Sequence, residues 1–173
     1  MEYIKGELVG TEPITTAEVV QSLRLDYYDA TEIARLITSA REAAEDYCNT
    51  DFVLKKYSIF SDTIICEFTS KRKPVKQIDT VTIYDNADTP ATVTANYKLA
   101  AGNRIIQVAI PTITNPRLYD AIKFEVQSGY TVIPSKVKDA MLWYCYNLYY
   151  KADMALWLPA FHSLLSTIRN RPA

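Results

Sequence analysis

Residues 124–153 read FEVQSGYTVIPSKVKDAMLWYCYNLYYKAD, and the spacing of the apolar residues changes within this stretch. Up to Gln127, apolar and polar side chains alternate, which is typical of a strand with one buried face. Pro134 suits the first turn of a helix, where its missing N–H costs nothing, and helical spacing runs from Val137 to Ala152. The stretch therefore predicts the last strand of a sheet followed by a long helix.

The predicted helix is apolar nearly all round. One broad face holds Met141, Leu142, Cys145, Leu148 and Tyr149, and a second face holds Trp143, Tyr146 and Tyr150. Because such a helix is normally covered on more than one side, we predict that one face lies in the core and the other in an interface. A cofactor pocket lined by the rings is the alternative.

A further apolar stripe is expected after a break around Pro159. Its members recur at helical spacing before the basic end RNRPA, and they are Trp157, Phe161, Leu164, Leu165 and Ile168. Two interpretations stay open here. The stripe either docks in a groove of a partner protein or packs back on its own domain.

Two helix starts lie near the N-terminus. Thr15 with Glu18 has the reciprocal pattern of a capping box, and Asp29 with Glu32 marks the start of a second helix. The second helix is expected to run to about Cys48. Its charged residues, which we expect on the solvent side, are Arg35, Arg41, Glu42, Glu45 and Asp46.

The region between the helices is rich in β-branched and aromatic residues. Strands are predicted at residues 52–60, 63–68, 78–84, 97–100, 104–110 and 121–127. The stretches DNADTP, AAGN and TNPR mark turns between them. Because the connections are short, antiparallel hairpins are favoured.

The predicted fold class is α+β, with an N-terminal helix pair, a central mostly antiparallel β-sheet, a C-terminal aromatic helix and a terminal amphipathic segment. The chain has 173 residues, which is enough to bury a core without a metal or a disulfide. We expect one domain over residues 1–173, helical in 1–50, β-rich in 51–133 and helical again in 134–173.

Charge is distributed unevenly along the chain. Residues 1–50 carry four basic and ten acidic side chains, whereas residues 134–173 carry five basic and two acidic ones. This polarity is compatible with head-to-tail packing of identical subunits. A formal net charge of -1 gives no reason to expect free nucleic-acid binding.

The cysteines and the N-terminus bear on the compartment. Cys48, Cys66 and Cys145 are odd in number and far apart, so neither a disulfide framework nor a zinc site is indicated. The N-terminus lacks the basic and apolar regions of a signal peptide, and no apolar run is long enough to span a bilayer. We expect a protein made in the cytoplasm, with no membrane partner.

Few residues suggest chemistry. His162 is the single histidine, and no serine, cysteine or carboxylate pattern points to it. Glu42, Glu45 and Asp46 could hold a divalent cation, but helical spacing around Arg41 favours an exposed, self-compensating face. No common nucleotide-binding or hydrolase motif is present in the sequence. We predict no catalytic residue, no cofactor and no metal.

A basic cluster lies between two predicted strands and comprises Lys71, Arg72, Lys73 and Lys76. It could contact phosphates or an acidic protein surface. A solvated loop is favoured, because specific binding of single strands would need aromatic residues among the charges.

The order of these elements resembles the phage head-tail connector family. PITTAEVVQSLRL (13–25) and DATEIARLITSAREAAEDYCNTDF (29–52) resemble its opening, a short helix ending in Leu-Arg and a longer one ending in Tyr before the first strand. Residues 124–153 and LPAFHSLLSTIRN (158–170) resemble its last strand, its Pro-started aromatic helix and its terminal segment. Asn49, Thr50 and Asp51 stand where the family usually has Thr-Gly-Arg.

This resemblance implies a virion adaptor that forms a ring, a dodecamer in the assembled particle, beneath the portal protein. Genomic DNA passes through the channel of such a ring, and loops between strands reach the next neck or tail protein. The implied portal contacts are Trp157, Phe161, Leu164, Leu165, Ile168 and Arg169. The implied subunit contacts are Trp143, Tyr146, Tyr150, Arg35 and Arg41, and Lys71, Arg72, Lys73, Lys76 and DNADTP are candidates for channel or ring-to-ring contacts.

The hypothesis from sequence is therefore a structural adaptor at the head-tail junction, with no catalysis. The alternative is a monomeric module that docks one partner through its aromatic C-terminal helices.

Overall fold

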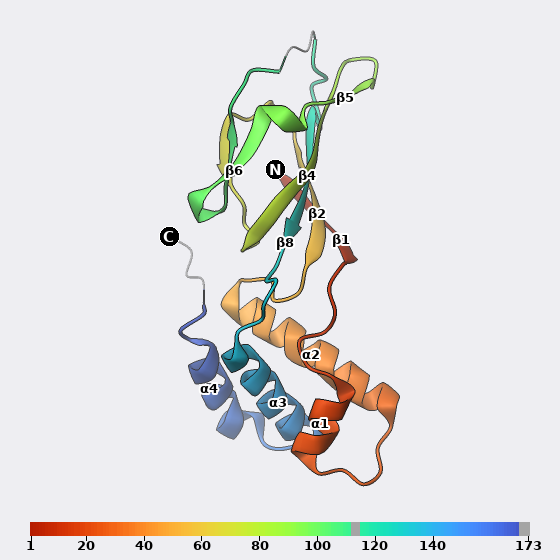
Figure 1. Ribbon diagram of the computed structural model, residues 1–173, viewed down its shortest axis with the longest axis vertical. Coiled ribbons are helices and arrows are strands. Elements are labelled where there is room, and N and C mark those ends of the chain that lie inside the picture. Colours follow the sequence, from red (N-terminus) through yellow and green to blue (C-terminus); the bar gives the residue numbers. More distant parts are fainter. Residues whose placement is uncertain (112–114, 170–173) are drawn as a thin grey trace. The chain divides into compact units, whose positions relative to one another are not determined.

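The computed structural model describes residues 1–111 and 115–169, and these form two compact units (Figure 1). The β unit comprises residues 1–10 and 54–130, and the helical unit comprises residues 11–53 and 131 onward. Helices and antiparallel sheets are thus segregated, which confirms the α+β fold class.

The β unit contains two antiparallel sheets. The first has the order β1-β2-β8-β4-β5, and the second has the order β3-β7-β6. The strands are β1 (Glu2–Leu8), β2 (Lys55–Ser61), β3 (Glu67–Thr69), β4 (Val75–Tyr84), β5 (Pro90–Thr92), β6 (Tyr97–Ala100), β7 (Arg104–Gln107) and β8 (Ile122–Ser128). Two short 3-10 turns, Thr94–Asn96 and Ala101–Asn103, flank β6.

Strand β8 lies in the middle of the larger sheet and contributes buried side chains to the centre of the β-unit core. Its residues alternate strictly, so that Ile122, Phe124 and Val126 are buried. The Phe124 ring meets Phe68 of β3 and Tyr97 of β6 edge-on, with centroids 5.0 and 5.1 Å apart. Rings from the smaller sheet therefore cover the inner face of the larger one.

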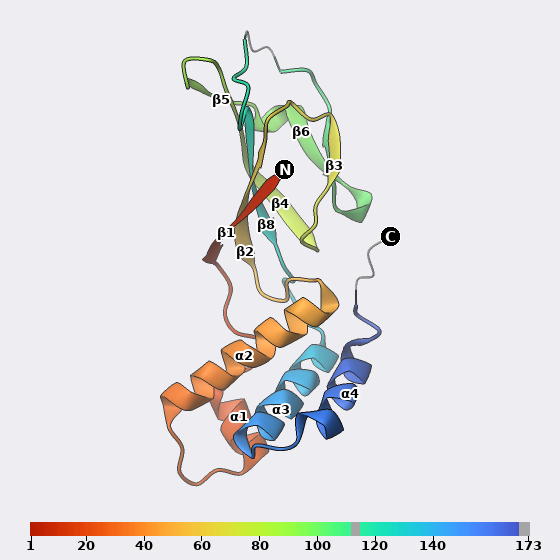
Figure 2. The same ribbon diagram turned by 180° about the vertical axis from the view of Figure 1, so that it is seen from behind.

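The helical unit contains α1 (Thr16–Leu23), α2 (Ala30–Cys48), α3 (Ser135–Tyr149) and α4 (Met154–Leu165). Helix α2 lies behind the other three in Figure 1 and in front of them in Figure 2. It packs against α1, α3 and α4. The helices at the two ends of the sequence thus share one core.

Helix starts are the best-predicted feature of this unit. The Glu18 N–H donates to the Thr15 hydroxyl at 3.2 Å, and the Thr15 N–H donates to the Glu18 carboxylate at 2.6 Å. The N–H of Thr31 donates to Asp29 at 2.8 Å. Both predicted caps are confirmed, and α3 begins directly after Pro134.

The predicted strands are confirmed with shifted ends, and β6 coincides with residues 97–100. Two strands were missed. β1 is an edge strand that contains Gly6 and has apolar Ile4 exposed, so it shows no clear alternation. β5 has three residues and begins with Pro90, which has no N–H for a ladder.

Candidate interaction surfaces

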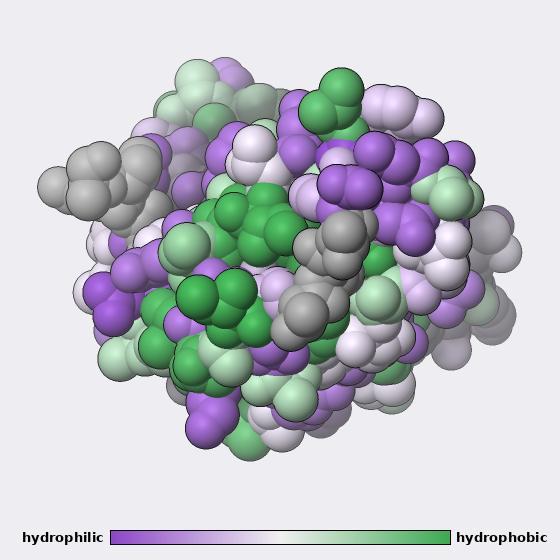
Figure 3. Space-filling model, turned by 90° about the horizontal axis from the view of Figure 1, so that it is seen from above, coloured by the Kyte–Doolittle hydropathy of each residue, from purple (hydrophilic) through white to green (hydrophobic). Residues whose placement is uncertain are grey.

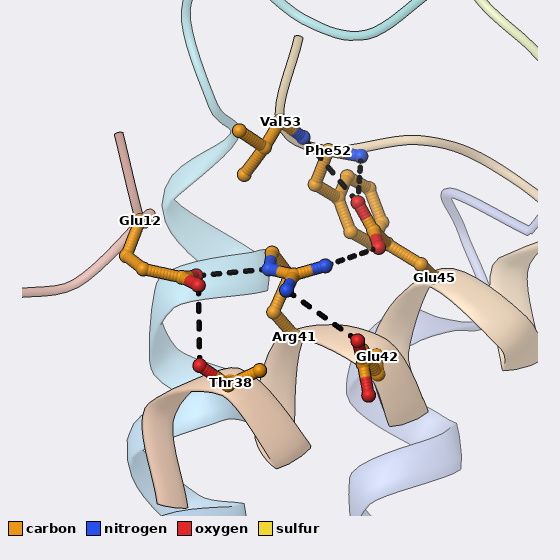
Figure 4. A network of polar contacts seen from close by, with 7 residues as sticks. All are labelled: Glu12, Thr38, Arg41, Glu42, Glu45, Phe52 and Val53. Carbon is orange, nitrogen blue, oxygen red and sulfur yellow. Dashed lines mark hydrogen bonds and ion pairs between the residues drawn. The ribbon is translucent and has the colours of Figure 1, made fainter. Parts of the chain in front are cut away.

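A buried ion network ties α2 to its flanking chain segments (Figure 4). Arg41 donates to the Glu12 carboxylate through Nε and to the Glu45 carboxylate through Nη1, both at 2.9 Å. Glu45 also accepts the backbone N–H groups of Phe52 and Val53, at 2.9 and 3.4 Å. One arginine and one glutamate therefore fix both the segment before α1 and the segment after α2.

This network corrects the prediction of a solvated charged face on α2. Arg41 is 4% exposed and Glu45 is 3% exposed, whereas Glu42 and Asp46 face solvent. Burial lowers the pKa of Arg41, but Glu45 and Glu12 more than offset it, so the pKa is raised and the guanidinium stays charged. Arg41 is thus buried inside the single chain. Its side chain is not exposed for the predicted contact with a neighbouring subunit.

The carboxylates of α2 do not converge. Glu45 points to Arg41 and the backbone after α2, while Glu42 reaches Arg41 only at 3.6 Å from the outside. Within residues 1–111 and 115–169, no group of three or more His, Cys, Asp or Glu side chains is placed to hold a metal ion.

Helix α3 presents an aromatic row to solvent, which we define as Trp143, Tyr146 and Tyr150. Their exposed fractions are 41%, 44% and 51%. Trp143 stacks on Tyr146 with centroids 6.2 Å apart, and Tyr146 meets Tyr150 at 4.9 Å. The Tyr150 hydroxyl donates to the carbonyl of Leu23 in α1 at 3.1 Å. The row is therefore an ordered surface that the single chain leaves uncovered.

A hollow of about 350 Å³ lies beside this row. Its lining residues come from α1 and α3 and are Ser22, Asp139, Leu142, Trp143 and Tyr146. The opposite face of α3 holds buried Val137, Ala140, Met141 and Cys145. The prediction of one core face and one outward aromatic face agrees with this arrangement, and its role as a subunit contact stays a prediction.

Helix α4 packs back on the helical unit. Trp157, Phe161 and Leu165 are buried, and the Tyr144 ring of α3 lies 5.2 Å from the rings of both Trp157 and Phe161. The Cys48 thiol contacts the Leu165 carbonyl at 3.9 Å, and burial raises the pKa of this thiol to about 11. Three of the predicted portal contacts are thus core residues of the single chain.

The predicted helix break around Pro159 is wrong. Helix α4 runs through Pro159, and the chain turns earlier, where Lys151 has a φ of 51° and Asp153 caps the N–H of Ala155 at 3.0 Å. Pro159 has no N–H to donate to the carbonyl of Ala155. Ala155 and Pro159 line a hollow of about 340 Å³ together with Met154, Leu158 and His162.

Outward residues of α4 and the segment after it include Leu164 and Arg169, and Ile168 is half-buried. The His162 ring stacks on Tyr47 of α2 at 4.0 Å and 5°, while the Arg169 guanidinium lies 4.7 Å from the Tyr47 centroid. Tyr47 and His162 therefore hold α4 on α2, which gives His162 a packing role.

Basic residues 71–76 lie between β3 and β4 and at the start of β4. The Lys71 ammonium lies 5.5 Å from the Tyr3 ring, and the Arg72 guanidinium lies 5.9 Å from the Tyr57 ring. Lys71 and Lys76 face solvent, while Arg72 and Lys73 are half-buried. Two of the cations in this segment lie against rings of the β unit, so the segment is not a fully solvated connection.

Sequence reasoning missed an apolar patch on the β unit, around the segments that precede residue 112 and follow residue 114. Ile110 is 88% exposed and Leu118 is 89% exposed, and Val108 and Tyr119 are also exposed. Figure 3 looks onto this end of the unit and shows hydrophobic residues gathered among polar ones. The signal in the sequence was weak, because isolated apolar residues near TNPR carry no period.

Arg117 orders the segment that carries this patch. Its guanidinium lies 4.3 Å from the Tyr84 ring and 5.3 Å from the Tyr119 ring, and it pairs with Asp88 at 3.0 Å. Asp88 belongs to the predicted DNADTP turn, in which the Asp85 carboxylate accepts the N–H groups of Ala87 and Thr89 at 2.9 and 2.8 Å. The turn is confirmed.

In the part of the chain that the structure describes, no helix has the length and apolar character needed to cross a bilayer.

Comparisons with known proteins give a likeness in structure but none in sequence. No family model matches the chain, and no curated protein matches it significantly. A structure of the neck of the empty GTA particle, computed with C6 symmetry, contains a chain with 19% identity and a TM-score of 0.77, covering 100% of this chain and 97% of that one. The virion of the native gene transfer agent (GTA) particle gives the same values. The neck of the native GTA particle with C12 symmetry gives 17% identity and a TM-score of 0.70, covering 97% of each chain.

At such identities the likeness shows a shared fold. It spans both units and every described helix and strand, and a fold found in particle necks agrees with the resemblance to head-tail connectors.

Proposed function

We propose that this chain is a structural adaptor in the neck of a tailed, phage-like particle. Identical copies form a ring, with a dodecamer as the expected number, beneath the portal protein. The ring joins the head to the next neck or tail protein, and the genome passes through its channel. The chain performs no catalysis, is made in the host cytoplasm and ends in the virion.

The observation that carries this proposal is the whole-chain likeness to a chain of gene transfer agent necks. Further support comes from the order of elements, which resembles the connector family from the capped first helix to the aromatic third one. The ordered aromatic row of α3 is a surface of the kind that protein interfaces use as anchors.

Each surface has a place in this proposal. The aromatic row and Arg35 contact the neighbouring subunit. Leu164, Ile168 and Arg169 contact the portal, and buried Trp157, Phe161 and Leu165 support them from inside. The channel and the next ring are contacted by the remaining surfaces, which are residues 71–76, the DNADTP turn and the patch around Ile110 and Leu118.

The test is binding to the portal protein of the same particle, followed by mass photometry. Wild type should give a complex heavier than the portal alone, by the mass of a ring. Leu164→Glu should reduce binding, because it places a charge on the outer side of α4 and leaves the core intact. Tyr27→Glu is a control that adds the same charge at a 93% exposed residue between α1 and α2.

A truncation after Lys151 would be a poor test, since it removes buried Trp157, Phe161 and Leu165 and so opens the helical core. If wild type stays monomeric and does not bind the portal, the monomeric binding module becomes the better account.

A further inference from the structure

The helical unit carries two different exposed stripes. The α3 stripe consists of Lys136, Asp139, Trp143, Tyr146 and Tyr150, and the α2 stripe consists of Glu32, Arg35, Ser39, Glu42 and Asp46. In both stripes successive residues are three and four positions apart, so each stripe follows one side of its helix. All members are exposed except Ser39, which is half-buried.

The α3 stripe is an apolar seam on a rigid support. Stacking of Trp143 on Tyr146 and the bond from the Tyr150 hydroxyl to α1 fix the rings before any partner arrives. Binding by an ordered row costs little conformational entropy. Large rings held in this way are typical anchors of a protein interface.

The α2 stripe is charged and offers a cation suited to such rings. Among residues 1–111 and 115–169, Arg35 makes no ion pair, whereas Arg41 on the same helix is fully engaged inside. A guanidinium stacks well on tryptophan and tyrosine faces. Glu32 and Glu42 add carboxylates that accept hydrogen bonds from tyrosine hydroxyls and from lysine.

Charge also distinguishes the two sides of the unit. Residues 11–53, which include α2, carry three basic and nine acidic side chains. Residues 131–169, which include α3, carry four basic and two acidic ones. The α2 stripe itself carries one basic and three acidic side chains, and the α3 stripe carries one of each. Repulsion between like charges therefore disfavours contact of the α2 stripe with itself.

Helices α2 and α3 pack together, and the residues of both stripes lie outside the buried faces of these helices. A copy that binds one neighbour through α3 therefore keeps its α2 stripe free for another. Contacts of this heterologous type generate closed rings or open filaments.

We propose that the α3 stripe of one copy packs against the α2 stripe of the next copy, head to tail, with Arg35 stacked on the aromatic row. This inference rests on the proposed function, since it assigns the subunit contact of the ring. It excludes a symmetric contact of α3 with α3.

Disulfide trapping tests the pairing directly. Arg35→Cys in one chain is mixed with Tyr146→Cys in a second chain of different tag length, both in a Cys66→Ser background that removes the exposed native thiol. The control replaces Arg35→Cys by Tyr27→Cys, which lies between α1 and α2, outside both stripes, and is 93% exposed.

The mixed dimer of positions 35 and 146 should form about tenfold faster than the mixed dimer of positions 27 and 146, because trapping reports local concentration. Equal rates, or a faster dimer of position 146 with itself, would overturn the head-to-tail pairing. The three substituted side chains are exposed, so the fold should be kept, and circular dichroism checks this.

Association is measured on the same proteins without the cysteines. Trp143→Ala together with Tyr146→Ala should weaken self-association of the chain, alone or on the portal, by about tenfold or more. The failures are distinguishable. If rings form on the portal but the 35–146 dimer is not trapped selectively, this inference is contradicted and the proposed function stands. If the chain forms no rings and does not bind the portal, both are contradicted.

Discussion

Strand β8 and helix α3 follow each other in the chain, yet their outward faces are built differently. On β8, Lys123, Glu125 and Gln127 alternate with buried residues and are bonded within the β unit. On α3, the outward face is the aromatic row. The polar groups on the outward face of β8 have hydrogen-bond partners in their own chain, so this face requires no further contact. An exposed and ordered apolar face is suited to binding a partner.

The largest loss of stability is expected at Phe124, the buried residue that lies between outward Lys123 and Glu125 on β8. Phe124→Ala should lower the free energy of unfolding by about 4 kcal/mol, because a fully buried ring that contacts Phe68 and Tyr97 is replaced by a cavity. Urea unfolding measures this loss, and hydrogen exchange locates it in the β unit.

The matched control is Trp143→Ala, which also removes a large ring but from the outward row. It should change the free energy of unfolding by less than about 1 kcal/mol while reducing self-association. A large loss of stability in this variant would mean that the aromatic row belongs to the core.

Arg41 gives the next largest effect and compares inward and outward charges on one helix. Arg41→Ala should lower the free energy of unfolding by about 3 kcal/mol, because buried Glu45 then loses its 2.9 Å bond to the guanidinium. Arg35→Ala should stay within about 0.5 kcal/mol of wild type, as an exposed substitution. Urea midpoints that agree for the two variants would contradict the distinction.

These residues also show where prediction from sequence ends. The bounds of α2 follow from its caps and its apolar period, and β6 follows from a short run between turn signals. Burial of Arg41 does not follow, because arginine and glutamate interleaved on a helix look the same whether they face water or a distant partner. Its partners are Glu12, far away in the chain, and Glu45, which in turn holds two backbone N–H groups.

The exposed surfaces divide in a similar way. The spacing predicts that Trp143, Tyr146 and Tyr150 share one side of the helix, but on a helix that is apolar nearly all round it does not decide which side faces outward. Burial of Trp157, Phe161 and Leu165 was one of two open interpretations, because helical spacing alone does not say what covers an apolar stripe. The patch with Ile110 and Leu118 has no period and is visible only once the chain is folded.

The contribution of the aromatic row to the stability of its own unit can be tested at one hydrogen bond, which Tyr150 makes to α1. Tyr150→Phe removes the bond to the Leu23 carbonyl and should cost about 1 kcal/mol. Tyr146→Phe is the control, since within the described residues no hydrogen bond of its hydroxyl is seen. If both variants unfold at the same urea concentration, the link between the aromatic row and α1 contributes nothing.

The smallest effect is expected on the outward face of β8 and depends on pH. Hydrogen bonds from Lys123 and Thr80 lower the pKa of Glu125 below its ordinary value, against the opposing effect of burial. Because the folded pKa lies below the unfolded one, Glu125 stabilises the fold at neutral pH, and this contribution is lost as the pH falls through the folded pKa. Since the pair is partly exposed, the contribution is about 0.5 kcal/mol.

Glu125→Gln should therefore remove a small part of the stability at pH 7 and leave the stability at low pH unchanged relative to wild type. Urea midpoints of both proteins across this pH range measure the difference. A constant difference at every pH would mean that the glutamine perturbs packing and that Glu125 adds no charge-dependent stability. A difference that vanishes at low pH supports an outward face of β8 that is satisfied by its own neighbours, in contrast to the aromatic row of α3.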